Sequence, residues 1–158
     1  MRFKLRPGDD EFVRSAPQRY VGVFEIPLPA DRVWADLTAD APLGWCRALT
    51  SVTWTSARPF GVGTTRTVKP VLPGLTIDEV FFRWEEGKRK SFYVNEASLP
   101  LFRSFAEDYL VEERSPSDCT FTWTIASETT AAGRPGSPIN ALIARSLFRD
   151  TRRHFKAR

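Results

Sequence analysis

The side chain best suited to acid–base chemistry in this sequence is Glu107. It lies in 105–111, a stretch expected to form a strand, and side-chain alternation puts it on the apolar face with Tyr109. A carboxylate on an apolar face is costly unless it is paired or protonated. Glu107 is therefore a candidate ligand anchor or general acid with a raised pKa. The other possibilities are a structural ion pair, with Arg66 or Arg103 as the partner, and a shift of the strand phase that exposes Glu107.

His154 is the second candidate and the only histidine in the chain. On a helical wheel it lies near the centre of an apolar arc together with Leu147, so it should face inward or toward the mouth of a pocket. There it could serve as an acid or a base. Alternatively, it could bind backbone carbonyl groups and favour the negative end of the helix dipole.

Metal, nucleotide and hydrolase chemistry have little support. One histidine and two distant cysteines, Cys46 and Cys119, do not make a zinc site or a disulfide framework, so we expect two reduced thiols. The glycines at 61–63 mark a turn between strands and lack the following helix that a phosphate loop requires. No G-x-S-x-G motif is present. We expect no metal and no cofactor.

The elements that must position these residues form an α+β pattern. A strand at 20–26 precedes two short helical pieces, at 29–38 and near Trp45, and six strands with short turns follow between 51 and 125. After Ser137, expected as the helix cap, an unbroken helix runs to about residue 157. Short turn-rich links indicate an antiparallel meander. The sequence predicts a curved seven-stranded sheet around the long helix, with 1–18 as an N-terminal extension and 19–158 as the domain.

The phases of the strands and the helix predict a pocket between them. In the strand at 77–84 we favour Val80, Phe82 and Trp84 as the inward set over Ile77 and Phe81, which would turn Glu79 outward. In 120–125 the aromatic rings share one face. The expected pocket residues are Arg66, Val80, Phe82, Trp84, Phe105, Glu107, Tyr109, Phe121, Trp123, Leu147 and His154.

Charge and composition narrow the function classes. From Arg145 onward there are six basic residues and one acid, which leaves a net charge of −1 for the rest of a chain whose total is +4. Because the basic charge is confined to one element, we do not expect a nucleic-acid partner. No apolar run is long enough to span a membrane, so we expect no stable membrane insertion, and the first residues lack the apolar core of a signal peptide. These features predict a cytoplasmic protein.

Several segments resemble the START-like superfamily, and within it the polyketide cyclase/dehydratase-type branch (SRPBCC family). They are PADRVWADLT, GVGTTRTV, EVFFRWEEGKRKSF, SFAEDYLVE and CTFTWTI, followed by the long final helix. The resemblance covers about residues 19–158. It implies a helix-grip fold with a deep cavity between sheet and helix. Members bind lipids, sterols, polyketides or hormones, and some are cyclases or aromatases, but they share no catalytic residue that could be transferred to this chain.

Three functions remain open at this point. The favoured one is binding of a small hydrophobic molecule, because such sites are concave and mostly apolar with a few polar anchors. The second is a polyketide cyclase, aromatase or dehydratase that uses the same cavity, with Glu107 or His154 as its acid–base group. The third is a protein-interaction module whose core is filled by side chains. The sequence predicts no oligomeric state.

Overall fold

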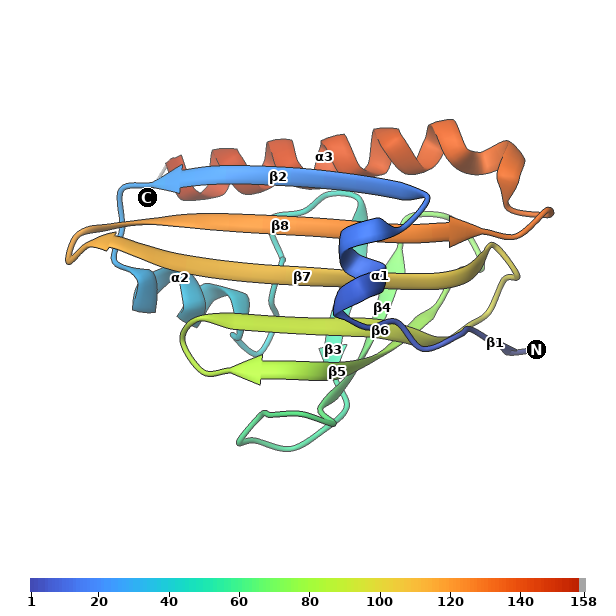
Figure 1. Cartoon of the computed structure of the whole chain (residues 1–158), viewed down its shortest axis with the longest axis horizontal. Coiled ribbons are helices and arrows are strands. Elements are labelled where there is room, and N and C mark those ends of the chain that lie inside the picture. Colours follow the sequence, from blue (N-terminus) through green and yellow to red (C-terminus); the bar gives the residue numbers. More distant parts are fainter. Residues whose placement is uncertain (157–158) are drawn as a thin grey trace.

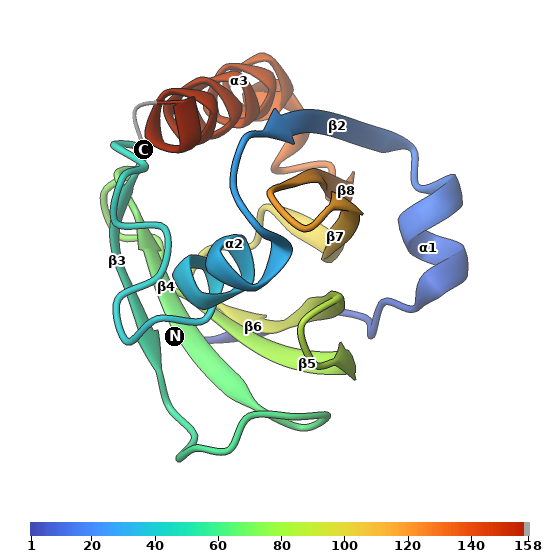
Figure 2. The same ribbon diagram turned by 90° about the vertical axis from the view of Figure 1, so that its left-hand side faces the viewer.

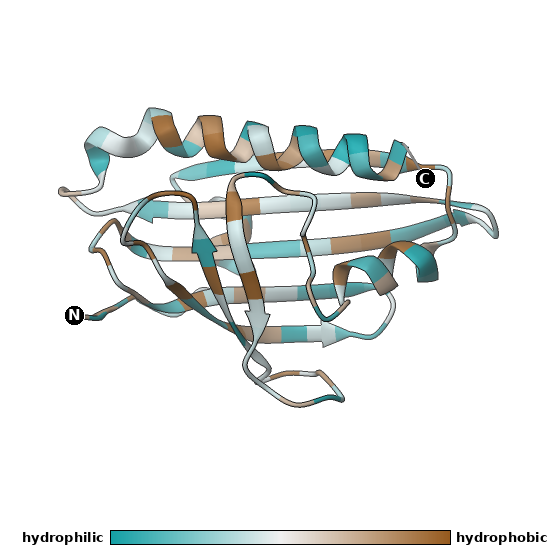
Figure 3. Ribbon diagram, turned by 180° about the vertical axis from the view of Figure 1, so that it is seen from behind, coloured by the Kyte–Doolittle hydropathy of each residue, from teal (hydrophilic) through white to brown (hydrophobic). Residues whose placement is uncertain are grey.

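Seven long antiparallel strands form the framework of the protein in the computed structural model, which describes residues 1–156 (Figure 1). Their order in the sheet is β2-β8-β7-β6-β5-β4-β3. The strands are β2 (Gln18–Ile26), β3 (Leu49–Trp54), β4 (Thr65–Pro70), β5 (Ile77–Glu85), β6 (Arg89–Ala97), β7 (Phe102–Ser115) and β8 (Asp118–Thr129). Hydrophilic and hydrophobic residues alternate along them (Figure 3), as expected when the two faces of a sheet differ.

Helix α3 (Ser137–Lys156) follows a short 3-10 turn, η1 (Arg134–Gly136), and lies along the opening between the edge strands β2 and β3 (Figure 2). Leu147 and Phe155 are buried, while Arg145 and Arg149 face solvent. The helix-grip architecture expected from the sequence is therefore confirmed. The helix begins at Ser137 itself. Its predicted end near residue 157 and the basic residue Arg158 lie outside the described residues.

A single short helix separates β2 from β3. Helix α2 (Ala30–Leu37) buries Val33, Trp34 and Leu37 and lies at one end of the half-barrel (Figure 2). The prediction of a second short helix near Trp45 is wrong, because the chain there forms a series of turns. No helix in residues 1–156 is both long enough and apolar enough to cross a membrane.

The N-terminal segment covers part of the outer face of the sheet. Strand β1 (Phe3–Lys4) pairs with the end of β6, and helix α1 (Asp10–Ser15) packs against β7 and β8 (Figure 1). Asp9 caps α1 by accepting a hydrogen bond from the Phe12 amide at 2.9 Å. The side chain of Val13 is buried in this layer, whereas that of Leu5 joins the hydrophobic core.

The residues of β5 that face the inside of the sheet differ from those predicted. Glu79 and Phe81 are buried on the inner face, whereas Val80 and Phe82 are only half-buried. A bulge lies between Phe81 and Arg83, because these two residues pair with consecutive residues of β6. The extra residue changes the alternation, so that Trp84 contacts the Phe81 ring across 5.1 Å. The expected set Val80, Phe82 and Trp84 therefore does not share one face.

Candidate ligand-binding cavity

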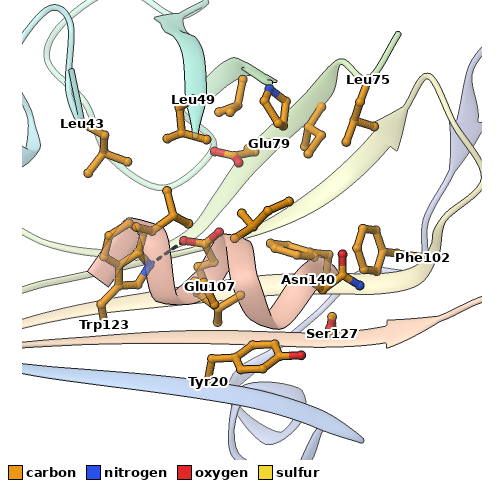
Figure 4. Close-up of a pocket in the computed structure, with 18 of the residues that line it drawn as sticks. Tyr20, Leu43, Leu49, Leu75, Glu79, Phe102, Glu107, Trp123, Ser127 and Asn140 are labelled. Atoms are coloured by element: carbon orange, nitrogen blue, oxygen red, sulfur yellow. Dashed lines mark hydrogen bonds between the residues drawn. The ribbon is translucent and has the colours of Figure 1, made fainter. Parts of the chain in front are cut away.

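A cavity of about 100 Å³ lies between the inner face of the sheet and the first half of α3 (Figure 4). Most of its wall is apolar, and five polar side chains interrupt it. The lining residues are Tyr20, Leu43, Leu49, Arg66, Val68, Pro70, Leu75, Ile77, Glu79, Phe102, Phe105, Glu107, Tyr109, Trp123, Ile125, Ser127, Asn140, Ile143, Ala144 and Leu147.

Pairing between neighbouring strands aligns four of the polar and aromatic residues as two cross-strand pairs. Arg66 on β4 pairs directly with Glu79 on β5. Tyr109 on β7 pairs directly with Trp123 on β8. Glu107 lies two residues before Tyr109 on the same strand, and so points to the same inner face. Strand register thus brings together residues that are up to 57 positions apart in the sequence.

These side chains form one continuous hydrogen-bonded chain across the wall. Arg66 Nε donates to Glu79 Oε1 at 2.5 Å, and Arg66 Nη2 donates to the Tyr109 hydroxyl at 3.4 Å. The Tyr109 hydroxyl donates to Glu107 Oε1 at 3.0 Å. Trp123 Nε1 donates to the same oxygen at 2.6 Å. Figure 4 shows the bond between Trp123 and Glu107. The network therefore couples an ion pair to a second carboxyl group.

Burial sets the protonation of this network. It raises the pKa of Glu107 to about 7, with a further increase from the nearby charge of Glu79, although the bonds from Trp123 and Tyr109 oppose it. Burial also raises the pKa of Tyr109, which keeps its hydroxyl protonated at neutral pH. Although burial alone would lower the pKa of Arg66, the charge of Glu79 raises it, so Arg66 stays a cation.

A second buried cation, Lys90, lies beside the network without lining the cavity. Its Nζ donates to the carbonyl of Leu37 at 3.0 Å, at the C-terminal end of α2. The ammonium also lies 4.6 Å from the centre of the Tyr109 ring. Burial, followed by the charge of Arg66, lowers the pKa of Lys90 well below its usual value. We interpret Lys90 as a helix cap inside the core.

The structure separates the predicted pocket residues into two groups. Those that line the cavity are Arg66, Phe105, Glu107, Tyr109, Trp123 and Leu147; those that do not are Val80, Phe82, Trp84, Phe121 and His154. Val80 and Phe82 are excluded because Glu79 and Phe81 occupy the inward-facing positions of β5. Phe121 is fully buried and stacks on Phe24 with ring centres 5.5 Å apart. Aromatic packing thus fills the half of the interior near α2.

The sequence suggested Arg66 or Arg103 as the partner of Glu107. Arg66 instead forms its ion pair with Glu79, and Arg103 is exposed. The prediction that Glu79 points outward is wrong, because Glu79 and Phe81 face the inside of the sheet in place of Val80 and Phe82. Asp108 does point away from the cavity, as expected, and its Oδ1 accepts a hydrogen bond from Arg89 Nε at 2.9 Å.

His154 lies at the other end of α3, away from the cavity. Its Nε2 is 3.0 Å from Asp36 Oδ2, and its ring stacks on Trp45 with ring centres 3.9 Å apart. Trp45 in turn donates from Nε1 to the Thr151 hydroxyl at 3.0 Å. These contacts join the last turns of α3 to α2 and the following turns, so His154 has a packing role in this structure.

Sequence reasoning missed several lining residues. Tyr20, Ser127 and Asn140 come from the ends of β2, β8 and α3, where phase alone does not predict contact with a cavity. Ile143 lies one helical turn before Leu147 on the same face of the helix and could have been included. Leu43 lies in the turns that replace the expected second helix.

The chemistry available in this cavity is hydrogen bonding and proton transfer. The residues that the structure describes contain no group of three or more potential metal ligands. Cys46 and Cys119 are both free and buried, and burial raises the pKa of the Cys46 thiol to about 12. A buried carboxyl group with a pKa near 7 can hold or exchange a proton under neutral conditions.

A sheet wrapped around a final helix with an apolar cavity between them defines a helix-grip protein of the START-like class. The chain belongs to the family described as "Polyketide cyclase / dehydrase and lipid transport", whose model matches residues 17–157. An uncharacterized protein of Mycobacterium tuberculosis is 36% identical over 154 residues, which cover 93% of this chain and 90% of that relative. A Mycobacterium bovis protein matches with the same values.

Solved structures show the same fold at lower identity. The major latex-like protein 151 of Panax ginseng superposes with a TM-score of 0.62 at 18% identity, over 87% of this chain and 97% of that chain. The protein XoxI of Bacillus cereus gives a TM-score of 0.66 at 15% identity, over 87% of this chain and 94% of that chain. At this identity the likeness concerns the fold alone.

Proposed function

We propose that the protein binds a small hydrophobic molecule in the cavity beneath α3. The main support for this proposal is the composition of the cavity wall. Fifteen of the twenty lining residues are apolar or aromatic, and hydrogen bonds connect some of the polar side chains. Such a combination of apolar surface with a few polar anchors is typical of small-molecule sites. The family description, which includes lipid transport, supports the same function.

The volume of the cavity limits the size of the ligand. Its volume of about 100 Å³ is smaller than the roughly 300–1,000 Å³ of sites for drug-sized ligands. It is closer to the roughly 150 Å³ apolar cavity that takes up benzene in an engineered protein. A single ring or a short chain is therefore the ligand size that fits without rearrangement.

Ligand-dependent thermal stability tests the proposal. A molecule that binds the folded state alone raises the melting temperature as its concentration increases. Native mass spectrometry of the purified protein should also reveal a co-purified small molecule. The matched variants are Ala144→Leu, which fills the cavity from α3, and Ala132→Leu, which adds the same atoms at an exposed site. We expect Ala144→Leu to abolish the ligand-dependent shift and Ala132→Leu to retain it.

Absence of any shift across a broad set of apolar compounds, with no co-purified molecule, would contradict ligand binding. It would favour the third function, an interaction module in which the helix and sheet serve as a scaffold. The cytoplasmic location, the absence of a nucleic-acid partner and the assignment of pocket residues to a ligand stay predictions.

A second candidate function is a cyclase or dehydratase that acts in the same cavity. Two observations support it: the carboxyl group of Glu107 is part of the cavity wall with a pKa near 7, and the family includes cyclases and dehydrases. If the protein catalyses such a reaction, Glu107→Gln should reduce turnover by at least 100-fold. Full turnover in that variant would remove Glu107 from consideration as the acid–base group.

A further inference from the structure

The cavity comes nearest to solvent at the end of the half-barrel where α3 begins. Twelve of its twenty lining residues are buried, and the other eight are half-buried. These eight belong to the first turns of α3 and to strand ends that antiparallel pairing brings to one end of the sheet. We define them as the mouth of the cavity: Tyr20, Leu49, Pro70, Ile77, Phe102, Phe105, Asn140 and Ile143.

Two side chains of the mouth carry hydrogen-bonding groups, the hydroxyl of Tyr20 and the carboxamide of Asn140. Neither side chain forms a hydrogen bond with another residue in the range 1–156. The buried polar groups of the cavity wall are bonded mostly to one another, as in the pair of Arg66 with Glu79. The polar groups that are open to a ligand therefore lie mainly at the mouth.

Contacts between the two walls bring the groups of the mouth together. Gln18 on β2 bridges β8 and α3: its Oε1 accepts from Ser127 Oγ at 3.0 Å, and its Nε2 donates to Ser137 Oγ at 3.2 Å. Tyr20 lies two residues after Gln18 on the same face of β2. Asn140 follows Ser137 by three residues in α3. Figure 4 shows Tyr20, Ser127 and Asn140 at the end of the cavity opposite to Trp123.

We infer that the mouth recognises an uncharged carbonyl group of a ligand whose apolar part fills the cavity. The carbonyl oxygen accepts hydrogen bonds from the hydroxyl of Tyr20 and from Nδ2 of Asn140. A carbonyl oxygen has two lone pairs and brings no proton of its own, so these two donors satisfy it completely. The inference rests on the proposed binding function and names its ligand class, a small ketone, ester or amide with an apolar ring or short chain.

The charges of the cavity favour a neutral polar group at the mouth. None of the eight residues of the mouth is charged. The cation in the cavity wall, Arg66, is already paired with Glu79. A ligand carboxylate or ammonium would therefore lose part of its hydration at the mouth without gaining a partner of opposite charge. A carbonyl group loses much less hydration and finds two donors.

Four probes of similar shape test the inference: cumene, acetophenone, 1-phenylethanol and benzoate. Their dissociation constants should be measured by calorimetry at pH 7 with the full chain. We expect acetophenone to bind more tightly than 1-phenylethanol and benzoate. The ratio of the affinities for acetophenone and cumene isolates the carbonyl contacts, because the two molecules share the ring and differ by the replacement of a methyl group with an oxygen.

Tyr20→Phe and Asn140→Leu each remove one of the two donors and keep the approximate size of the side chain. We expect each change to lower the ratio of the affinities for acetophenone and cumene about fivefold, which corresponds to one hydrogen bond. Tyr93→Phe is the matched control, because it removes the hydroxyl of a half-buried tyrosine that does not line the cavity. That change should alter the ratio by less than about twofold. If Asn140→Leu does not fold, Tyr20→Phe still measures the effect.

Nuclear Overhauser contacts of bound acetophenone measure its orientation. The methyl group next to the carbonyl should contact Tyr20 and Asn140, and the ring should contact Trp123 and Leu147. The reverse orientation, with the methyl group against Trp123, would overturn the inference. Tightest binding by 1-phenylethanol or by benzoate would also overturn it, since the preferred group would then be a hydroxyl or an anion.

The outcomes separate this inference from the proposed function. Binding of cumene and acetophenone that Ala144→Leu abolishes, with an affinity ratio that neither Tyr20→Phe nor Asn140→Leu changes, would leave the binding function in place and overturn recognition at the mouth. Failure of all four probes to bind would contradict both the carbonyl inference and a binding site for ligands of this size.

Discussion

At the scale of the residue, the interior of this protein holds more charge than its surroundings would normally allow. Arg66 and Glu79 are 1% and 4% exposed, and Lys90 is completely buried. Burying a charge is costly unless a partner and further hydrogen bonds compensate. The pairing of Arg66 with Glu79 supplies that compensation. Burial favours the neutral forms of the other two groups, because it lowers the pKa of Lys90 and raises the pKa of Glu107 to about 7.

Glu107 should make the stability of the fold depend on pH. Its pKa is about 7 in the folded protein against 4.5 for the free group, so the folded state binds the proton more tightly and stability falls as the pH rises through 7. Relative to Glu107→Gln, the unmodified protein should lose about 2–3 kcal/mol of unfolding free energy between pH 5 and pH 8. Urea unfolding at the two pH values measures this difference.

The control for that measurement is Glu112→Gln, an exposed position on the same strand. It should change the unfolding free energy by less than about 0.5 kcal/mol at either pH. A stability difference between Glu107→Gln and the unmodified protein that is the same at pH 5 and pH 8 would show that Glu107 keeps an ordinary pKa.

The buried ion pair gives a second prediction at this scale. Arg66→Met should destabilise the fold by about 3–5 kcal/mol, because the carboxylate of Glu79 loses its partner while still buried. The double change Arg66→Met with Glu79→Leu should be less destabilising than Arg66→Met alone. Denaturant unfolding of the single and double variants measures both values, and a double variant at least as unstable as the single one would contradict the unpaired-charge explanation.

At the scale of the element, the cavity depends on how α3 is held against the sheet. Near its middle the helix approaches β2 at Gly22, where a β-carbon would lie 2.9 Å from the ring of Phe148. The Phe148 ring also packs edge-on against Trp123, with ring centres 5.5 Å apart. A glycine at this point of β2 therefore admits the ring that joins the helix to the cavity wall.

Gly22→Ala should destabilise the protein by about 1–3 kcal/mol through overpacking against Phe148. Combining it with Phe148→Leu should recover part of that loss, with a coupling above about 0.5 kcal/mol in a double-mutant cycle. Gly61→Ala is the control, because a β-carbon there meets no atom within 4 Å. Additive effects of Gly22→Ala and Phe148→Leu would show that the helix does not approach β2 at this point.

At the scale of the whole molecule, the sheet is covered on both faces, by α3 on the inside and by the N-terminal segment on the outside (Figure 2). Gly8 lies so close to the sheet that a β-carbon there would be 3.0 Å from the Ala106 side chain. Helix α1 lies on the outer face of β7 and β8, and no residue before Tyr20 lines the cavity. The N-terminal residues are thus expected to add stability without contributing to ligand binding.

A chain that begins at Pro17 should fold and bind the same ligands, but with an unfolding free energy lower by about 2–5 kcal/mol. The estimate reflects the loss of two buried side chains, Leu5 and Val13. Denaturant unfolding and ligand titration of both chain lengths measure the two effects. A shortened chain that fails to fold would contradict the separation of residues 1–18 from the domain, and Val13→Ala would test the same layer without truncation.

The order and type of most elements could be read from the sequence alone. Strand alternation between turns and a breaker-free helix after Ser137 are local signals, and both follow from the geometry of the backbone. They also place Glu107 and Tyr109 on one inner face, because position along a regular strand determines which way a side chain points. The family resemblance then implied the helix-grip arrangement, which the structure confirms.

Tertiary structure alone decided which part of the interior is open. The bulge after Phe81 depends on pairing with β6, so no local sequence pattern predicts it. It places Trp84 out of phase with Val80 and Phe82, whereas Glu79 and Phe81 face inward and Glu79 meets Arg66. Likewise, Phe121 and Trp123 share one strand face, yet only Trp123 lines the cavity, because rings from other elements fill the space around Phe121. Periodicity specifies a face, whereas packing from distant segments determines whether that face meets a side chain or an open space.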